Sequence, residues 1–349
     1  MKWPDKLETV QDKISAVGTV FEHETVDAIF DGDDFKGVAF MGCTFRNCTF
    51  RNVQMQESSF TQCKFIGCMF LGCNEINSIV MKSTFENCGW KNCRGTKKIR
   101  MESKFYNCAF SGFEDETTQW LKVTFEAVIF EKGKFFRSSF LDCILKDTSF
   151  AEIVMERVAM MKWDTAAVTF KKDCRLDTVM LHEATLDGHD WSGMDLTRTQ
   201  FLNCSLRSNL FTSATLLSSG FTDCELVGAQ MEKVKGEYLR FFRCNLEGSV
   251  FVGAELNGGQ FTESNLDKAN LSNARLSKSV IHKCSARKTR FDSVDLSESS
   301  IENNDVRGSQ LTNLKLKYAK ADRLIEDDDT DWTGSIKVSM MLNDDREKN

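Results

Sequence analysis

Large apolar residues recur at every fifth position along most of the chain. In a first stretch this repeated position runs from Phe30 to Phe170, and in a second stretch it runs from Leu176 to Leu316. Phe is the most frequent residue there in the first stretch, and Leu in the second. The residue two positions earlier is small or apolar, and the other three are mostly polar. The pattern predicts five-residue units in which two side chains point inward and three point outward.

A five-residue period excludes both regular secondary structures as the explanation. Five residues advance an α-helix by about 500°, so successive apolar side chains would lie about 140° apart and form no apolar face. A continuous strand fails as well, because its side chains alternate between two faces and an odd period would reverse them in every unit. We therefore expect short strands separated by corners.

Individual units carry the signature of a known repeat. Residues 263–276 read ESNLDKANLSNARL and resemble the A(D/N)LxX signature of the pentapeptide-repeat family. Residues 43–47 and 48–52, both Cys-Thr-Phe-Arg-Asn, resemble its Phe-centred variant. The resemblance covers roughly residues 28–321. It implies an all-β fold, a right-handed quadrilateral β-helix in which four units make one 20-residue coil, with about fifteen coils in this chain.

Identical residues also recur at intervals of 20, as a 20-residue coil requires. Such residues lie on the same side of successive coils, so we expect them to stack in columns inside the solenoid. The predicted core columns contain Cys48, Cys68, Cys88 and Cys108, then Cys204, Cys224 and Cys244, and finally Phe201, Phe221, Phe241 and Phe261.

All 14 cysteines occupy the small inward position of the repeat. A column presents its sulfurs in parallel, whereas zinc needs ligands that converge, so we expect small buried hydrophobes, no metal and no cofactor. Neighbouring coils lie about 4.8 Å apart, a spacing compatible with disulfides, but parallel side-chain directions disfavour them. We predict 14 free thiols. With no signal-like apolar segment at the start, we expect a cytoplasmic chain; export by a signal-independent route is the alternative.

The regions before and after the repeats differ from them in composition. Residues 1–27 form an N-terminal cap, for which the spacing of Leu7, Val10 and Ile14 predicts a helix, with a strand as the alternative. Residues 322–349 hold 9 acidic and 4 basic side chains and form an acidic C-terminal cap and tail.

The repeats themselves fall into a Phe-centred segment, residues 28–173, and a Leu-centred segment, residues 174–321. The frame shifts by one residue between Phe170 and Leu176. No linker rich in Gly, Ser or Pro separates the segments, so we expect one continuous core with a local kink. A boundary between two stacked segments is the alternative.

The repeat fails most clearly at three inward positions that are 20 residues apart, Glu75, Gly95 and Asp115. Lys98 and Arg100 also occupy inward positions. Because an ionised side chain in an apolar core carries a heavy desolvation cost, we expect the chain to bulge outward here, most clearly at residues 94–100. The bulge is either a local irregularity or a partner-binding patch. The candidate patch consists of Glu75, Arg94, Lys97, Lys98, Arg100, Glu114, Asp115 and Glu116.

The chain offers little chemistry for catalysis. Of its 4 histidines, His189 falls at an inward position, beside Asp187 and Asp190, yet no nucleophile motif or Gly-rich phosphate loop accompanies it. A core filled with Phe, Leu and Cys leaves no substrate cavity. We expect no catalytic residues, no metal site and no enzyme.

Charge narrows the range of partners. The net charge is −6, of which −5 belongs to residues 322–349, so the repeats are nearly neutral. Phosphate binding needs a basic stripe, and a membrane span needs about 20 apolar residues, so we expect neither direct nucleic-acid binding nor a membrane protein.

The family resemblance implies two kinds of function. Some pentapeptide-repeat proteins mimic DNA and bind gyrase, which requires a strongly negative surface; others are accessory or effector proteins of bacterial secretion systems. The nearly neutral repeats favour a non-enzymatic scaffold or adaptor that binds another protein. A DNA-mimicking gyrase- or topoisomerase-binding protein is the alternative, and the oligomeric state is not predicted.

Overall fold

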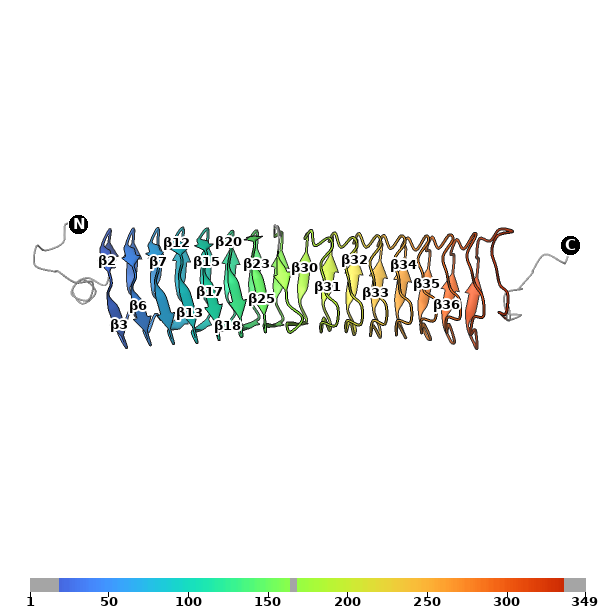
Figure 1. The fold of residues 1–349 in the computed structure, drawn as a ribbon, viewed down its shortest axis with the longest axis horizontal. Coiled ribbons are helices and arrows are strands. Elements are labelled where there is room, and N and C mark those ends of the chain that lie inside the picture. The colour runs from blue at the N-terminus through green and yellow to red at the C-terminus, as the bar shows by residue number, and fades with distance from the viewer. Residues whose placement is uncertain (1–18, 164–167, 336–349) are drawn as a thin grey trace, which may run out of the picture. The chain divides into compact units, whose positions relative to one another are not determined.

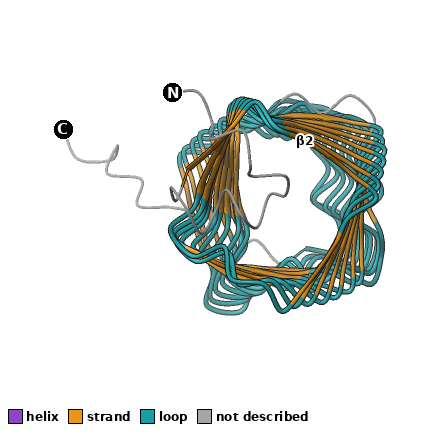
Figure 2. Cartoon of the chain, turned by 90° about the vertical axis from the view of Figure 1, so that its left-hand side faces the viewer, coloured by secondary structure: helices purple, strands orange, loops and turns teal. Residues whose placement is uncertain are grey.

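The computed structural model describes residues 19–163 and 168–335, and these consist of short strands, turns and bends without a helix (Figure 1). The fold is an all-β parallel β-solenoid of about fifteen coils. Figure 2 shows the coils end on, with strands along the sides and loops at the corners. The chain divides into two compact units, residues 1–175 and 176–349. The predicted continuity of the two repeat segments stays a prediction.

In the first unit most sides of each coil are strands of two or three residues, and each strand pairs in parallel with the strand 20 residues later, as in Thr84↔Lys104. We call the four sides faces A to D. Face A contains β1 (Thr19–Phe21), β4 (Ala39–Met41), β7 (Ser59–Thr61), β11 (Ile79–Met81), β15 (Ile99–Met101), β19 (Gln119–Leu121), β23 (Ser139–Leu141) and β27 (Ala159–Met161). Face B contains β2 (Glu24–Val26), β5 (Thr44–Arg46), β8 (Lys64–Ile66), β12 (Thr84–Glu86), β16 (Lys104–Tyr106), β20 (Thr124–Glu126) and β24 (Ile144–Lys146).

The other two sides follow the same rule. Face C contains β3 (Ile29–Asp31), β6 (Thr49–Arg51), β9 (Met69–Leu71), β13 (Gly89–Lys91), β17 (Ala109–Ser111), β21 (Ile129–Glu131), β25 (Ser149–Ala151) and β28 (Thr169–Phe170). Face D contains β10 (Asn74–Ile76), β14 (Arg94–Thr96), β18 (Glu114–Glu116), β22 (Lys134–Phe136) and β26 (Val154–Glu156). The boundary between the units falls within β29 (Arg175–Asp177).

Each strand of the first unit points its middle residue inward and its two flanking residues outward, and the next residue turns the corner. At the corner the backbone is left-handed, with φ of 51° at Asn47 and 64° at Gly67. Asn and Gly suit this position because they enter the left-handed region at little cost. The five-residue unit is therefore one short strand plus one corner.

Stacked aromatic rings fill the first unit. Phe45, Phe65 and Phe85 form one column, with ring centroids 4.9 and 4.6 Å apart and nearly parallel planes. Rings of neighbouring columns meet edge to face, as do Phe45 and Phe50 at 5.6 Å. This is the geometry that the quadrupoles of aromatic rings favour.

The 14 cysteines are all buried and free. Each has its sulfur near a carbonyl oxygen of the preceding coil; the Cys68 Sγ, for example, donates to the Phe45 oxygen at 3.4 Å. The sulfhydryl groups thus have partners within the backbone ladder.

The second unit has three-residue strands on one side of its coils and single bridges on the other three. The strands are β30 (Met180–His182), β31 (Gln200–Leu202), β32 (Gly220–Thr222), β33 (Arg240–Phe242), β34 (Gln260–Thr262), β35 (Val280–His282), β36 (Ser300–Glu302) and β37 (Lys320–Asp322). On the other sides the small residue closes a tight turn, as where the Ala229 N–H donates to the Leu226 oxygen at 3.0 Å. The coils of the second unit therefore turn tightly on these three sides, at Phe-centred units such as Phe211 as well as at Leu-centred ones.

The ends and the frame shift differ in detail from the predicted boundaries. Strand β1 begins at Thr19, within the predicted N-terminal cap, while the helix expected over Leu7, Val10 and Ile14 lies outside the described residues. At the other end the ladder continues as far as Asp331, which bridges Gln310. The extra residue of the frame shift is accommodated by a turn in which the Cys174 N–H donates to the Lys171 oxygen at 2.9 Å.

The buried cysteines predict a clear chemical behaviour. Burial raises the pKa of Cys143 to about 12 and that of Cys284 to about 11, so these two form little thiolate at pH 8, and all 14 cysteines are buried away from a reagent in solution. We expect a thiol reagent such as Ellman's reagent to label almost no cysteine in the native protein and all 14 in denaturant. Fewer than 14 labelled thiols in denaturant without reductant would reveal disulfides and contradict the structure.

Candidate functional site

Four residues of the predicted patch lie inside the first unit. Glu75 and Asp115 are the middle residues of β10 and β18, Arg100 is the middle residue of β15, and Lys98 precedes β15. Their exposed fractions are between 3% and 7%. The prediction of an outward bulge at residues 94–100 is wrong, because β10, β14 and β18 pair in the ordinary 20-residue register there.

The four side chains neutralise one another; we call them the internal charge cluster (Glu75, Lys98, Arg100 and Asp115). Arg100 pairs directly with Glu75 and also donates to the Ser78 hydroxyl at 3.3 Å. The Lys98 Nζ lies 2.6 Å from Asp115 and 3.5 Å from Glu75. The ion pairs between two cations and two carboxylates thus offset the loss of hydration that each side chain suffers on burial. The charged residues can therefore stay inside the coil, and the chain does not bulge outward.

Gly95 makes room for this cluster. A Cβ at position 95 would overlap the end of the Lys98 side chain. The second unit repeats the arrangement in apolar form, where a Cβ at Gly236 would lie 3.0 Å from the Leu239 side chain. In both places a glycine at the large inward position leaves space for a long side chain at the small one.

The two carboxyl groups differ in their electrostatics. Burial opposes the ionisation of Glu75, but Lys98 and Arg100 together outweigh it and hold the pKa of Glu75 below its ordinary value. Asp115 forms its ion pair with Lys98, but burial outweighs this pairing and raises the pKa of Asp115. Glu75 is therefore the centre of the cluster and Asp115 its weaker member.

The other four patch residues, Arg94, Lys97, Glu114 and Glu116, are exposed on face D and its corner. The Arg94 Nε lies 3.2 Å from the Glu114 carboxylate in the next coil. Half of the predicted patch thus lies inside the coils and half on their outer surface, so the eight residues form no single binding surface.

The inside of the first unit offers little room for a substrate. The two cavities beside the internal charge cluster, both lined by Glu75, Trp90 and Arg100 among others, have volumes of about 20 Å³ each. This is about the space of one water molecule. Within residues 19–163 and 168–335 no three His, Cys, Asp or Glu side chains converge as a metal site would require. No helix among the described residues has the length and hydrophobicity to cross a bilayer.

His189 also lies inside its coil, in the second unit. Its backbone N–H donates to the Asn209 side chain at 2.9 Å, and its ring lies 4.3 Å from that of Trp191. Burial lowers the pKa of His189 to about 4, so the ring is neutral at physiological pH.

A different surface of the first unit stands out by its lack of charge. We call it the face A stripe; it consists of the outward residues of β11, β15, β19, β23 and β27. These residues are Ile79, Met81, Ile99, Met101, Gln119, Leu121, Ser139, Leu141, Ala159 and Met161. None is charged, whereas faces B, C and D carry charged side chains on their outward positions over the same coils. Ile79 is 39% exposed and Gln119 is also exposed, while the others are half-buried.

Exposed, mostly basic corners flank the face A stripe. On the edge toward face D, the corner residues Lys97, Arg137 and Arg157 are basic and none is acidic. On the edge toward face B the corners alternate in charge, as Lys82, Glu102, Lys122, Asp142 and Lys162. There the Lys82 Nζ lies 3.8 Å from Glu102. Sequence reasoning missed this surface because it followed the inward positions; reading the outward positions at intervals of 20 would have found it.

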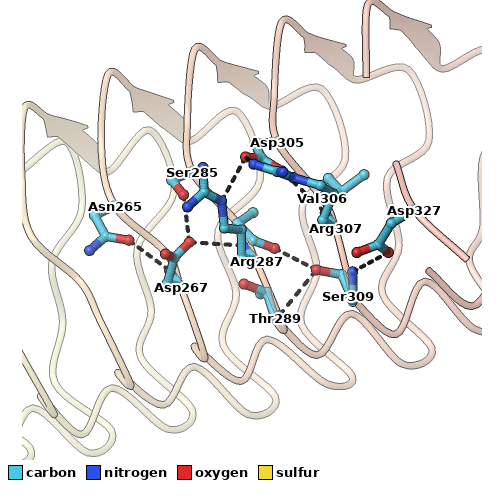
Figure 3. A network of polar contacts seen from close by, with 12 residues as sticks. Asn265, Asp267, Ser285, Arg287, Thr289, Asp305, Val306, Arg307, Ser309 and Asp327 are labelled. Atoms are coloured by element: carbon cyan, nitrogen blue, oxygen red, sulfur yellow. Dashed lines mark hydrogen bonds and ion pairs between the residues drawn. The ribbon is translucent and has the colours of Figure 1, made fainter. Parts of the chain in front are cut away.

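In the second unit, outer charges also pair between neighbouring coils. Figure 3 shows Asp305 between Arg287 and Arg307, whose guanidinium groups approach it to 2.6 Å. The side chain of Arg307 lowers the pKa of Asp305 most, with Arg287 adding to the effect. Asp267, one coil before Arg287, accepts from the Ser285 hydroxyl at 2.6 Å (Figure 3). The acidic side chains of this network are therefore already paired or hydrogen-bonded.

Comparison with known families agrees with the fold. The description "Pentapeptide repeat region" matches residues 133–211 and 194–271, and "Pentapeptide repeats (8 copies)" matches residues 28–74. Together these stretches cover more than half of the chain, which therefore belongs to the pentapeptide-repeat family. No curated protein matches it.

Several solved structures are similar to the chain. Full-length QnrB1, a plasmid-mediated fluoroquinolone resistance protein, is 15% identical, with 58% of this chain and 86% of that chain covered and a TM-score of 0.28. HetL from the cyanobacterium Nostoc, involved in heterocyst differentiation regulation, is 13% identical, with 78% and 88% covered and a TM-score of 0.14. The A-module of the Azotobacter vinelandii mannuronan C-5 epimerase AlgE6 is 8% identical, with 90% and 92% covered and a TM-score of 0.27. At such values these likenesses carry no argument about activity.

The internal charge cluster predicts an unequal response to substitution. Glu75→Gln leaves two buried cations with one carboxylate, so we expect it to lower the free energy of unfolding by about 3–5 kcal/mol in denaturant titrations. Asp115→Asn should cost less, because burial already disfavours the ionised form of Asp115. Glu114→Gln, which breaks the exposed pair with Arg94, is the control and should cost less than about 1 kcal/mol. Equal losses for Glu75→Gln and Glu114→Gln would contradict the buried pairing.

Proposed function

We propose that this chain is a non-enzymatic scaffold or adaptor that binds other proteins with its outer faces. The observation that carries the proposal is the face A stripe, a band of uncharged and mostly apolar side chains on the outward positions of five adjacent strands. Outward positions contribute little to the core, so a row without charge there is unusual on a soluble surface and is typical of binding sites. The ladder beneath holds the backbone of the row rigid, so little backbone entropy is lost on binding.

The interior supports a structural role. The inward positions hold stacked rings, free cysteines and the internal charge cluster, whose members satisfy one another. Catalytic groups with perturbed pKa values usually face a pocket that admits a substrate, whereas Glu75 and Asp115 face cavities of about 20 Å³. These groups therefore serve the fold in our proposal.

The gyrase-binding alternative has less support. DNA mimicry needs a continuous negative surface, but acidic side chains of the second unit are paired with basic ones in neighbouring coils. The Asp223 carboxylate lies 2.6 Å from Arg243, and Glu247 lies 2.6 Å from Lys268. A role in a bacterial secretion system and a cytoplasmic location stay predictions.

The proposal is tested by affinity capture. The tagged full-length chain, expressed in its source cells, should enrich one or a few proteins in near-stoichiometric amounts, as measured by quantitative mass spectrometry. An equally expressed tag alone is the control. Capture of nothing above this control would overturn the scaffold function.

A further inference from the structure

We propose that the face A stripe binds an amphipathic α-helix of a partner protein, and that the acidic flank of this helix lies along the Lys97, Arg137 and Arg157 edge. The inference rests on the proposed function and specifies the chemistry of the partner. Three properties of the stripe support it: its dimensions, its side chains and the charges along its edges.

The dimensions suit one helix. The stripe covers five strands, and four steps of about 4.8 Å separate the first from the last, so it is roughly 19 Å long. It is one short strand wide. An α-helix rises 1.5 Å per residue, so about 13–16 residues, or four turns, cover this length. The apolar face of an amphipathic helix is a similarly narrow band.

The side chains suit a helix surface as well. Met81, Met101 and Met161 are unbranched and flexible, and Met-rich surfaces adapt to the uneven profile of a helix. Leu121 and Leu141 lie between them in the same column. No aromatic residue lies on the stripe, and most of its side chains are half-buried, so they project little. A membrane-binding surface instead inserts projecting apolar groups some 5–10 Å into the bilayer.

The basic edges of the stripe favour a partner with acidic side chains. They disfavour a second copy of this chain as the molecule that binds the stripe. The edge toward face D carries Lys97, Arg137 and Arg157 without an acidic residue, and the edge toward face B carries three basic and two acidic corners. Two copies placed face to face would bring net basic edges together, whichever way they are turned. A helix with acidic residues along one flank is complementary, and its orientation follows from the more basic edge.

The experiment uses the full-length chain and a designed probe. The probe is a fluorescein-labelled 18-residue helical peptide with Leu along one face and Glu along one flank; its counterpart has Lys in place of each Glu. In anisotropy titrations we expect the Glu peptide to bind at least tenfold more tightly than the Lys peptide. Leu121→Arg should weaken binding of the Glu peptide at least tenfold. Ile129→Arg, which puts the same charge on an exposed position of face C, should leave it unchanged.

A charge reversal tests the edge. The triple variant Lys97→Glu, Arg137→Glu, Arg157→Glu should reverse the preference, so that the Lys peptide binds more tightly. All three side chains are exposed, and circular dichroism with thermal melting checks that each variant folds.

Three outcomes would overturn the proposal. The first is absent binding of the Glu peptide, or binding that Leu121→Arg leaves intact. The second is binding to phosphatidylglycerol-containing vesicles that Leu121→Arg abolishes. The third is a dimer, seen by sedimentation, that Leu121→Arg dissociates. If affinity capture recovers the same partners with Leu121→Arg, the face A stripe is not the binding site, and the scaffold function stands. If the unsubstituted chain captures nothing, the scaffold function itself fails.

Discussion

The backbone ladder with its 20-residue register is the constraint on which the rest of this structure depends. In the first unit most sides of the coils donate to and accept from the coils before and after, as where the Lys64 N–H donates to the Cys43 oxygen at 2.8 Å. A residue is therefore bound to the residue 20 positions away, and its side chain points to the same side of the wall. An outward loop would leave ladder groups of both neighbouring coils without partners, at a cost comparable to a lost hydrogen bond for each buried group.

The internal charge cluster shows how strong this constraint is. Four ionisable side chains enter an aromatic core because their backbones cannot leave the ladder, and they are tolerated because they meet opposite charges there. Gly95 completes the arrangement by leaving space for Lys98. The ladder thus separates two sets of residues. Inward side chains must pack and pair with one another, whereas the core places no such constraint on the type of side chain at outward positions. A surface such as the face A stripe arises from the second set.

The five-residue period predicted short strands and corners, while the family resemblance implied the four-sided, 20-residue coil and the recurrence of identical residues at intervals of 20 supported it and its core columns. Sequence reasoning failed at Glu75 and Asp115, where the desolvation cost of each charge was counted without its partner. Those partners come from different sides of the coil: Glu75 and Asp115 lie on face D, Arg100 lies on face A, and Lys98 lies at the corner between them. Linear spacing does not show that side chains 23 or 25 residues apart meet across a core. Comparing the two outward residues of each unit with those 20 residues later would have shown the face A stripe.

Amide hydrogen exchange tests the central claim most directly, since it reports whether residues 94–100 remain in the ladder. The Arg94, Lys97 and Ile99 N–H groups donate to oxygens of neighbouring coils at 2.9–3.0 Å. Their counterparts in a coil with an apolar core, Lys134, Arg137 and Ser139, have the same kind of bonds at 2.9–3.0 Å. The structure predicts equally slow exchange in both sets, whereas fast exchange confined to residues 94–100 would show an outward loop and contradict the buried cluster.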